Sequence, residues 1–439
     1  SINNYCYPEN PEAGIDLFLE KLVQETEKEH EDILEQADET DAMFGELYSW
    51  YLRNPEYRSR VQKLVQSAFA GKPEDIISQS VAKALYGEVS PYSATRLERF
   101  AACAFAHFLQ YGMKLTERVE YEFKPMDMGN VMHEALESFA EEVRKRGMKW
   151  TELTEQERNE IADRCLDNIV ADYGNTVLKS SARNEYMIER TRRILRRTVW
   201  ALQKQLEQGE FQPEGFEVTF GGGRIDRVDI MEDQNKVYVK VIDYKTGNTS
   251  FDLVYLYHGL QLQLMIYLDG ALRVEQKKYP DKEIIPAGVF YYNIKDPMIQ
   301  EKIDADVEAV SAGLMKELKM NGLAQADPEL VYRMDSSLGS IPVAFNKDGS
   351  FRKNSSVADR TQFAVLGRYV RTKIEKIRSS ILEGDAEVSP YELGKKNACT
   401  YCPYMTVCGF DRRLSGYEFR RLKNFSDEEL WKAFDREAE

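Results

Sequence analysis

A chain of 439 residues with 43% hydrophobic side chains is long enough to build two or three domains with buried cores. Charged residues make up 30% of the chain, and it contains no run of about 18 apolar residues, so we expect no transmembrane helix. The formal net charge of -15 excludes a uniformly basic surface of the kind that binds nucleic acid by charge alone.

The first half of the chain is predicted to be mostly helical. Helices are expected over residues 10–90, and Ser93 is a suitable N-cap for a helix that runs through Cys103 to His107. Further helices are expected from about 128 to 208, with a break at 172–182. No glycine-rich phosphate-binding loop followed by Lys-Ser or Lys-Thr occurs, so nothing in the chain indicates nucleotide hydrolysis.

After residue 210 the pattern changes to that of strands. Residues 216–220 and 224–230 alternate in polarity around a glycine turn at 221–223, and a second turn precedes the β-rich run 237–244. These segments are typical of successive antiparallel strands. The remaining predictions are a helix over 260–272, a strand over 287–293, a loop or loose hairpin over 333–356, and a helix over 357–383.

Four cysteines have a spacing that indicates a metal site. Cys103 stands alone, and Cys399, Cys402 and Cys408 form a C-x2-C-x5-C group near the other end. Four thiolates suit an iron–sulfur cluster or structural zinc, and the spacing fits zinc less well than two paired C-x2-C groups would. Buried cysteines without metal are the remaining alternative. The irregular spacing of the six cysteines is unlike a secreted disulfide scaffold, which places the protein in the cytoplasm.

A carboxylate–lysine group lies between these cysteines in the sequence. Asp226 and Asp243 come at the ends of adjacent predicted strands, so both can hold one Mg²⁺ or Mn²⁺. Lys245 points to the same face as Asp243 because strand side chains alternate, and it can orient or deprotonate water. His133, on a helix opened by Gly129-Asn130, would add a nitrogen ligand and favour Mn²⁺.

Each of these residues also has an ordinary interpretation. An Asp-x-Lys on a strand is commonly a surface pair, Gly223-Arg-Ile-Asp226 can be a hairpin turn, and His133 can be a packed histidine. Glu217 is either a further acidic member of the site or an exposed strand glutamate. The order, spacing and predicted elements agree jointly with a hydrolytic metal site.

Two locally basic stretches are candidate DNA-binding surfaces. The first has Arg190, Arg193 and Arg197 at helical spacing, and the second follows the cysteine trio with Arg412 and Arg413. A solvated helix face is the alternative interpretation of each stretch.

At these residues the chain resembles a known family. His133, Gly223-Arg-Ile-Asp226, Ile242-Asp-Tyr-Lys245 and Gln263-x3-Tyr267 resemble the RecB-type branch of the PD-(D/E)XK nucleases. The contexts Leu85-Tyr86-Gly87, Ser93-Ala-Thr-Arg-Leu-Glu98 and Tyr257-His-Gly-Leu-Gln-Leu-Gln-Leu264 bring it close to the second-subunit family of the bacterial AddAB helicase–nucleases. The resemblance covers roughly residues 85–415.

The resemblance implies a role for each matching residue. His133, Asp226 and Asp243 correspond to metal ligands, with the Tyr244 carbonyl as a further one, and Lys245 corresponds to the catalytic lysine. Gln263 and Tyr267 correspond to a helix motif that lines the site. The ligands of a [4Fe–4S] cluster would be Cys103, Cys399, Cys402 and Cys408. The family has proline after the first of these cysteines, where this chain has Ala104, a change expected to affect helix entry and not ligation.

The resemblance also implies an architecture and a function. The expected fold is α/β (α+β), a restriction-endonuclease-like core with a central mixed sheet flanked by helices. Residues 1–90 would end an inactivated helicase-like region, 91–415 would form the nuclease domain, and 416–439 a basic, helical tail. The implied function is degradation of the 5′-ended strand of unwound DNA, with an AddA-like helicase subunit as partner. A catalytically dead DNA-binding scaffold and a stand-alone RecB-like exonuclease of a CRISPR type are the alternatives. The N-terminal Ser-Ile-Asn-Asn-Tyr, without a signal pattern, is expected to begin a fragment of a longer protein.

Overall fold

The computed structural model describes residues 39–68, 76–87, 93–116, 125–172, 181–221, 223–299, 306–414 and 416–438. The helices predicted before residue 39, and most of the break predicted at 172–182, lie outside the described residues. Within the described part of the chain, no helix is both long and apolar enough to cross a membrane.

A six-stranded mixed sheet forms the centre of the molecule, in the order β1-β2-β3-β4-β5-β6. Its strands are β1 (Gln212–Phe220), β2 (Gly223–Asp233), β3 (Lys236–Lys245), β4 (Glu283–Asn293), β5 (Asn321–Gln325) and β6 (Val357–Ala358). The first three strands are antiparallel neighbours, as predicted, whereas β4 runs parallel to β3 and β6 runs parallel to β5. This mixed α/β architecture confirms the predicted fold class.

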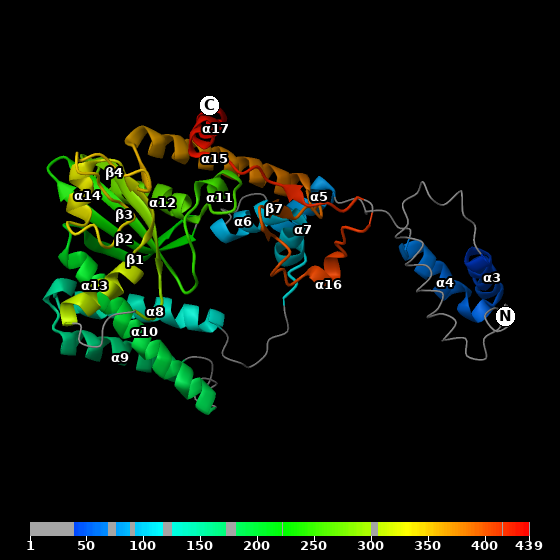
Figure 1. Ribbon diagram of the computed structural model, residues 1–439, viewed down its shortest axis with the longest axis horizontal. Helices are drawn as coiled ribbons and strands as arrows, with labels where there is room; N and C mark the ends of the chain where they lie inside the picture. Colours follow the sequence, from blue (N-terminus) through cyan, green and yellow to red (C-terminus); the bar gives the residue numbers. More distant parts are fainter. Residues whose placement is uncertain are drawn as a thin grey trace.

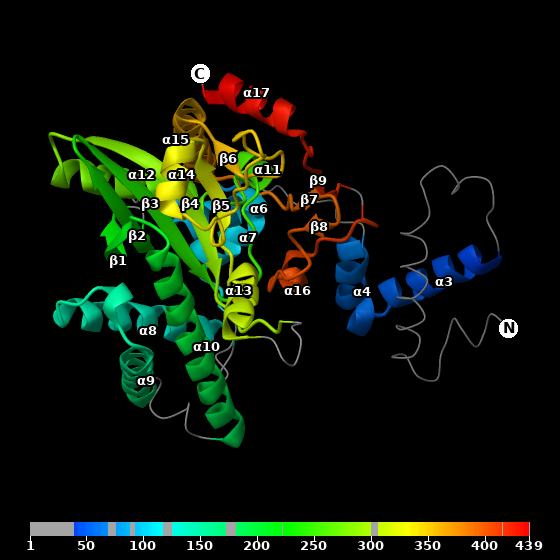
Figure 2. The ribbon, with the colours of Figure 1, turned by 60° about the vertical axis from the view of Figure 1, so that its left-hand side comes forward.

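Helices cover both faces of the sheet and give three layers (Figures 1 and 2). On one face, α8 (Pro125–Lys145), α9 (Glu155–Asp172) and α10 (Ala182–Glu207) bury an apolar core around Phe139, Leu202 and Phe290. On the other face, a second core around Leu97, Leu264 and Phe434 is built from α5 (Gln79–Tyr86), α6 (Ala94–Ala102), α12 (Gln263–Lys278), α15 (Arg360–Glu383) and α17 (Asp427–Ala438). The sheet is therefore shielded from water on both sides.

Smaller elements make up the rest of the secondary structure in the described residues. They are α3 (Glu39–Arg53), α4 (Pro55–Ala68), α7 (Ala104–His107), a π-helical turn (Phe108–Gly112), a 3-10 turn (Trp150–Glu152), α11 (Leu253–Tyr257), α13 (Val307–Glu317), α14 (Pro328–Met334), α16 (Met405–Cys408) and a small sheet of β7 (Tyr391–Leu393), β8 (Lys396–Asn397) and β9 (Arg420–Arg421). Helices α3 and α4 pack on one another through Leu47, Tyr51 and Val61, and this hairpin lies away from the sheet in Figure 1.

The helices at either end of the predicted nuclease domain share its core. Tyr86 of α5 and Phe434 of α17 are buried in the same apolar cluster as α15, although they lie before residue 91 and after residue 415. The boundaries at 90 and 415 remain predictions, and the packing extends across both of them.

Several predicted element bounds are wrong. Ser93 does cap α6, but that helix ends at Ala102 because Cys103 is extended, with φ of -166°, so Cys103 and His107 follow the break. Helix α8 begins at Pro125, before Gly129, with proline at the first helical position, where its missing N–H costs nothing. Helix α12 begins at Gln263, after the predicted Leu260. Strands β5 and β6 were not predicted, since both are too short to show alternation.

Candidate active site

Three carboxylates lie level with one another on adjacent strands. The last paired residues of β2 and β3 are Arg227 and Ile242, so Asp226 and Asp243 both occupy the next position toward the same edge. On the other side of β2, the pairs Phe216–Arg227 and Val218–Ile225 put Glu217 opposite Asp226. The register of the antiparallel strands thus brings together acidic residues that are far apart in the chain.

His133 of α8 completes a group of possible metal ligands. Its Nδ1 lies 3.4 Å from Asp226 Oδ2 and 3.7 Å from Glu217 Oε1. The ligand atoms of His133, Glu217 and Asp226 all lie within 4.8 Å of one another, and they form the one such group of His, Cys, Asp and Glu side chains among the described residues. One nitrogen and several carboxylate oxygens suit Mg²⁺ or Mn²⁺.

Glu217 is a site residue that the sequence left open. Its side chain is only 9% exposed and ion-pairs with Arg224 at 2.6 Å, so it is not an exposed strand glutamate. Its φ of +49° is unusual for a residue with a Cβ, and such strained backbone positions concentrate at functional sites. The three glycines at 221–223 in the sequence are the signal that could have found it, because counting outward from the pair Phe220–Gly223 places Glu217 opposite Asp226.

Asp243, Lys245, Gln263 and Tyr267 form a chain of polar contacts next to the His133–Glu217–Asp226 group. Lys245 Nζ lies 2.6 Å from Asp243 Oδ2 and donates to Gln263 Oε1 at 2.7 Å. Gln263 Nε2 donates in turn to the Tyr267 hydroxyl at 2.9 Å. The lysine also lies over the Tyr291 ring, 5.4 Å from its centroid. The structure therefore brings Asp243, Lys245, Gln263 and Tyr267 together, with the ammonium group of Lys245 held from two sides.

Burial makes the negative charges of this site unfavourable without a cation. Desolvation, and then the nearby charge of Asp243, raise the pKa of Asp226 to about 7, although the Tyr244 N–H donates to its Oδ2 at 2.7 Å. Desolvation also raises the pKa of Asp243, against the effect of Lys245. Burial alone would lower the pKa of His133, but Glu217 and Asp226 raise it. Strongly perturbed carboxyl groups that face one another are typical of functional sites.

Glu98 is a second site residue that the sequence analysis did not assign. It lies on α6, and its Oε1 accepts hydrogen bonds from the main-chain N–H groups of Leu262 and Gln263, at 2.7 and 2.9 Å. Burial raises its pKa to about 7. The predicted Tyr244 carbonyl ligand remains a prediction; the Tyr244 side chain is buried on the opposite face with Tyr292.

The four predicted cluster cysteines lie near one another. Cys103 is buried between α6 and α7, Cys399 and Cys402 lie in the loop that leads into α16, and Cys408 is the last residue of that helix. Burial, followed by the charges of the other three thiols, raises the pKa of Cys399 to about 12. The Phe410 N–H donates to Cys408 Sγ at 3.5 Å. A buried thiol and three half-buried ones, one of which accepts an N–H···S bond, suit a site in which thiolates bind a metal or an iron–sulfur cluster.

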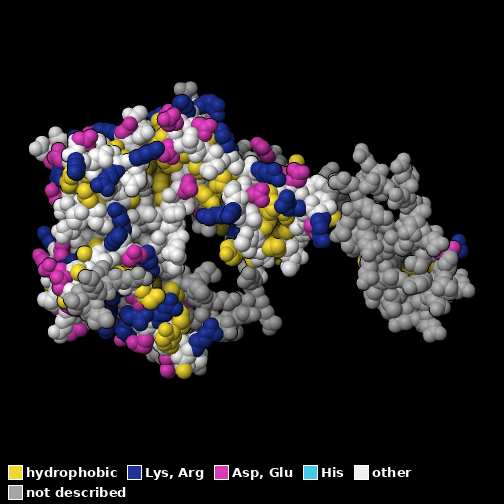
Figure 3. Space-filling view, in the orientation of Figure 1, with side chains coloured by type: hydrophobic (Ala, Val, Ile, Leu, Met, Phe, Trp, Pro, Cys, Tyr) yellow, Lys and Arg dark blue, Asp and Glu magenta, His cyan; other side chains and the backbone are white. Residues whose placement is uncertain are grey.

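The predicted DNA-binding arginines divide between two separate places, on α10 and in the loop after α16 (Figure 1). Arg193 is ion-paired with Asp296 at 2.6 Å, whereas Arg190 is exposed and Arg197 lies 5.7 Å from the centroid of the Trp200 ring. Basic side chains appear near the bottom of Figure 3, below the sheet. Arg413 pairs with Asp411, and Arg412 lies over Phe419. Because Arg193 and Arg413 are already ion-paired within the protein, they are weaker candidates for DNA binding than Arg190, Arg197 and Arg412.

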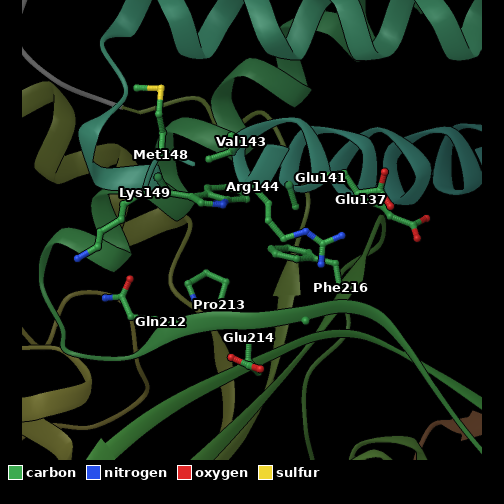
Figure 4. Close-up of a pocket in the computed structure, with 13 residues that line it drawn as sticks. Glu137, Glu141, Val143, Arg144, Met148, Lys149, Gln212, Pro213, Glu214 and Phe216 are labelled. Carbon is green, nitrogen blue, oxygen red and sulfur yellow. The ribbon is translucent and has the colours of Figure 1, made fainter. Parts of the chain in front are cut away.

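A cavity of about 210 Å³ adjoins the site without containing it (Figure 4). It lies between α8 and β1 and is lined by residues that include Glu137, Arg144, Trp150 and Phe216. Burial and the charge of Glu217 raise the pKa of Glu137, so this wall of the cavity lies close to the carboxylate group.

We predict that Glu217→Gln weakens Mn²⁺ binding by about 10- to 100-fold, because it removes one charged oxygen from the ligand group. Isothermal titration with Mn²⁺ measures the effect. Glu134→Gln, an exposed glutamate next to His133 on α8, is the matched control and should bind Mn²⁺ normally. Unchanged affinity in Glu217→Gln would exclude Glu217 as a ligand.

The raised pKa of Asp226 predicts a stability that depends on pH in metal-free protein. Since the folded pKa of about 7 lies above the usual value, this group favours folding below pH 4 and loses that contribution as the pH rises through 7. Asp226→Asn should therefore be more stable than the wild type at pH 8, on the order of 2 kcal/mol, with a smaller difference at pH 5. Thermal melting with and without Mg²⁺ tests this prediction. Added Mg²⁺ should stabilise only the wild type, and an equal difference at both pH values would contradict the assignment.

Comparison with known proteins agrees with this geometry. The model of the PD-(D/E)XK nuclease superfamily matches residues 91–409. The AddB-type subunit of the ATP-dependent helicase/deoxyribonuclease of Lachnoclostridium phytofermentans is 41% identical over 425 residues, which are 91% of this chain and 36% of that protein. The corresponding subunits of Thermoanaerobacter sp. (strain X514) and Alkaliphilus metalliredigens are 33% and 34% identical, over 91% and 90% of this chain and 37% of each protein.

The chain thus spans little more than a third of the length of these curated relatives. The resemblance to the second-subunit family, AddB, that the motifs indicated is confirmed. Because the family model covers most of the chain, the protein belongs to the PD-(D/E)XK nuclease superfamily.

Proposed function

We propose that this chain is the metal-dependent deoxyribonuclease region of an AddAB-type helicase–nuclease. In this proposal it cuts the 5′-ended strand of unwound DNA while double-strand breaks are processed for recombinational repair. The observation that carries the proposal is the position of Lys245, which Asp243 and Gln263 hold beside the His133–Glu217–Asp226 group. The names of the relatives, helicase/deoxyribonuclease subunits, support both the reaction and its setting.

The residues present fit a divalent ion. His133, Asp226 and Asp243 would hold Mg²⁺ or Mn²⁺, with Glu217 as a further oxygen donor and the Tyr244 carbonyl as the ligand that the family resemblance adds. The bound ion would supply Lewis acidity and offset the charge that develops on the phosphate. The raised pKa of Asp226 supports this assignment, because a cation would relieve the mutual repulsion of the carboxylates.

Lys245 carries the protein's own part of the chemistry. Its ammonium group donates to Gln263, so one face of the amine is held, and Tyr267 fixes the Gln263 amide. From that position the charge can neutralise a phosphate oxygen, and in its neutral form the amine can take a proton from the attacking water. Asp243, buried beside it, keeps the lysine directed toward the ligand group.

The cysteines are proposed to hold a [4Fe–4S] cluster through Cys103, Cys399, Cys402 and Cys408. The charges of Cys103, Cys402 and Cys408 all act on the Cys399 thiol, which supports one group shared by the four sulfurs. Two paired C-x2-C groups are typical of zinc, so a C-x2-C-x5-C group with one distant cysteine supports the cluster. Its role would be structural, since it joins residues from both ends of the nuclease region.

The proposed substrate and partner follow from the same relatives. A protein named as one subunit of a helicase/deoxyribonuclease works with other subunits, which supports an AddA-like helicase as partner and unwound, single-stranded DNA as substrate. Arg190 and Arg197 on α10, together with Arg412, are the exposed or stacked arginines proposed to contact the phosphate backbone. Such a complex would act in the cytoplasm.

We predict that Lys245→Ala and Asp243→Ala each lower Mg²⁺-dependent DNA cleavage at least about 100-fold. The first removes a positive charge that would stabilise the phosphate, and the second removes a proposed ligand of the metal ion. Binding of single-stranded DNA, measured by fluorescence anisotropy, should change little. Lys236→Ala, at the far end of the same strand, keeps full activity as the matched control. Full cleavage by Lys245→Ala would reject the proposal, and an inactive wild type would favour a DNA-binding scaffold.

We also predict that the protein purified without oxygen is brown and carries about four irons per chain. Metal analysis and visible absorbance measure this. Cys399→Ser should lose the iron and melt at a lower temperature, since the closure between residues 103 and 408 is lost. Cys165 lies in the core formed by α8, α9 and α10, so Cys165→Ser should keep the iron and serves as the control. About one zinc per chain, with no colour, would overturn the cluster assignment.

A further inference from the structure

Helix α12 carries Gln263 and Tyr267 but has no cap from its own sequence. Its N-cap position is Leu262, which makes no side-chain cap hydrogen bond. By contrast, α10, α13 and α15 begin after Ser181, Asp306 and Asp359, whose side chains accept hydrogen bonds from the first turns of their helices. A helix start without an acceptor leaves N–H groups unpaired, and burial would make this costly.

Glu98, on a different helix, takes the place of the missing cap. Its Oε1 accepts from both Leu262 N–H and Gln263 N–H, at 2.7 and 2.9 Å. A carboxylate at a helix N-terminus is also favoured by the helix dipole. Helix α6 holds Glu98 firmly, because Ser93 caps that helix and its Leu97 and Phe100 are buried in the core.

The same contact leads directly to the catalytic lysine. Glu98 holds the main chain of Gln263, and the Gln263 side chain accepts from Lys245 at 2.7 Å. Lys245 in turn pairs with Asp243 at 2.6 Å. The charges of Lys245 and Asp243 both act on the pKa of Glu98, which shows that the three groups are close. Within the described part of the chain, the hydrogen bonds of the Glu98 carboxylate go to the start of α12 and not to the His133–Glu217–Asp226 group.

We propose that Glu98 is a positioning residue: it caps α12 from outside and thereby fixes Gln263, and through Gln263 the amine of Lys245, in the geometry that cleavage requires. The proposal rests on the proposed nuclease function. This capping role requires Glu98 Oε1 as a hydrogen-bond acceptor, because that one atom accepts from both main-chain N–H groups. It does not require the negative charge of the side chain.

The acceptor role can be separated from a chemical role by substitution. Glu98→Ala removes the acceptor, so cleavage of single-stranded DNA at saturating substrate and Mg²⁺ should slow about 10- to 100-fold. Glu98→Gln keeps an Oε1 that can accept both N–H groups and should stay within about threefold of wild type. The affinity for DNA should be unchanged in both variants. Glu329→Ala, an exposed glutamate in the first turn of α14, is the matched control.

Hydrogen exchange measured by mass spectrometry gives a readout that does not depend on activity. In Glu98→Ala, amide exchange should speed up in peptides that cover 258–270, and in Glu98→Gln it should not. If Glu98→Ala does not fold, Glu98→Asp replaces it: the charge is kept but the shorter side chain cannot reach both amides, so it should show the same faster exchange and slower cleavage.

Three results would overturn the proposal. The first is a wild-type cleavage rate in Glu98→Ala or Glu98→Asp. The second is an equal loss of cleavage in Glu98→Gln and Glu98→Ala with unchanged amide exchange, and the third is unchanged amide exchange in every variant. The second of these would make Glu98 a participant in the chemistry. If the wild-type chain itself does not cut, the proposed nuclease function fails, and the exchange data still decide whether Glu98 caps α12.

Discussion

Three carboxylates, Glu217, Asp226 and Asp243, are held level with one another at one edge of the sheet, and their mutual repulsion is the constraint around which the site is built. The register of β1, β2 and β3 leaves them no freedom to separate, because each strand is paired along its length with the next. Burial then raises the pKa of Asp226 to about 7. A fold that concentrates buried negative charge in this way is less stable without a cation, and that instability favours metal binding.

The neighbouring layers direct the positive groups toward these carboxylates. From one face α8 supplies His133, whose pKa the acidic residues raise. On the strand itself Lys245 pairs with Asp243, and from the other face α12 supplies Gln263 to hold the lysine. The site thus draws on both helical layers as well as the sheet, so it exists only when the three layers are packed. Residues in the cores can therefore affect activity without touching substrate.

Helix α6 connects the cysteine group with the carboxylate–lysine group. Glu98 in its middle holds the start of α12, and Cys103 follows directly after its last residue. The extended conformation of Cys103 ends the helix, and the charges of Cys402 on Cys103 and of Cys103 on Cys399 indicate that these thiols lie close together. Helices α5, α15 and α17 pack in the same apolar core as α6 and so help to hold it in place. The cysteine group therefore lies at one end, and Lys245 at the other, of a short run of direct contacts.

The sequence by itself determined the strand-turn-strand pattern and the family, because both depend on local properties of the chain. For the same reason it named His133, Asp226, Asp243, Lys245, Gln263 and Tyr267 as candidate site residues. It could not place Glu98 or decide the role of Glu217. Glu98 acts through a contact between residues 98 and 263, and Glu217 depends on strand register and a left-handed backbone. Tertiary packing also decided that α6 ends before Cys103 and that α5 and α17 join the nuclease core, since burial across distant segments leaves no local periodicity to read.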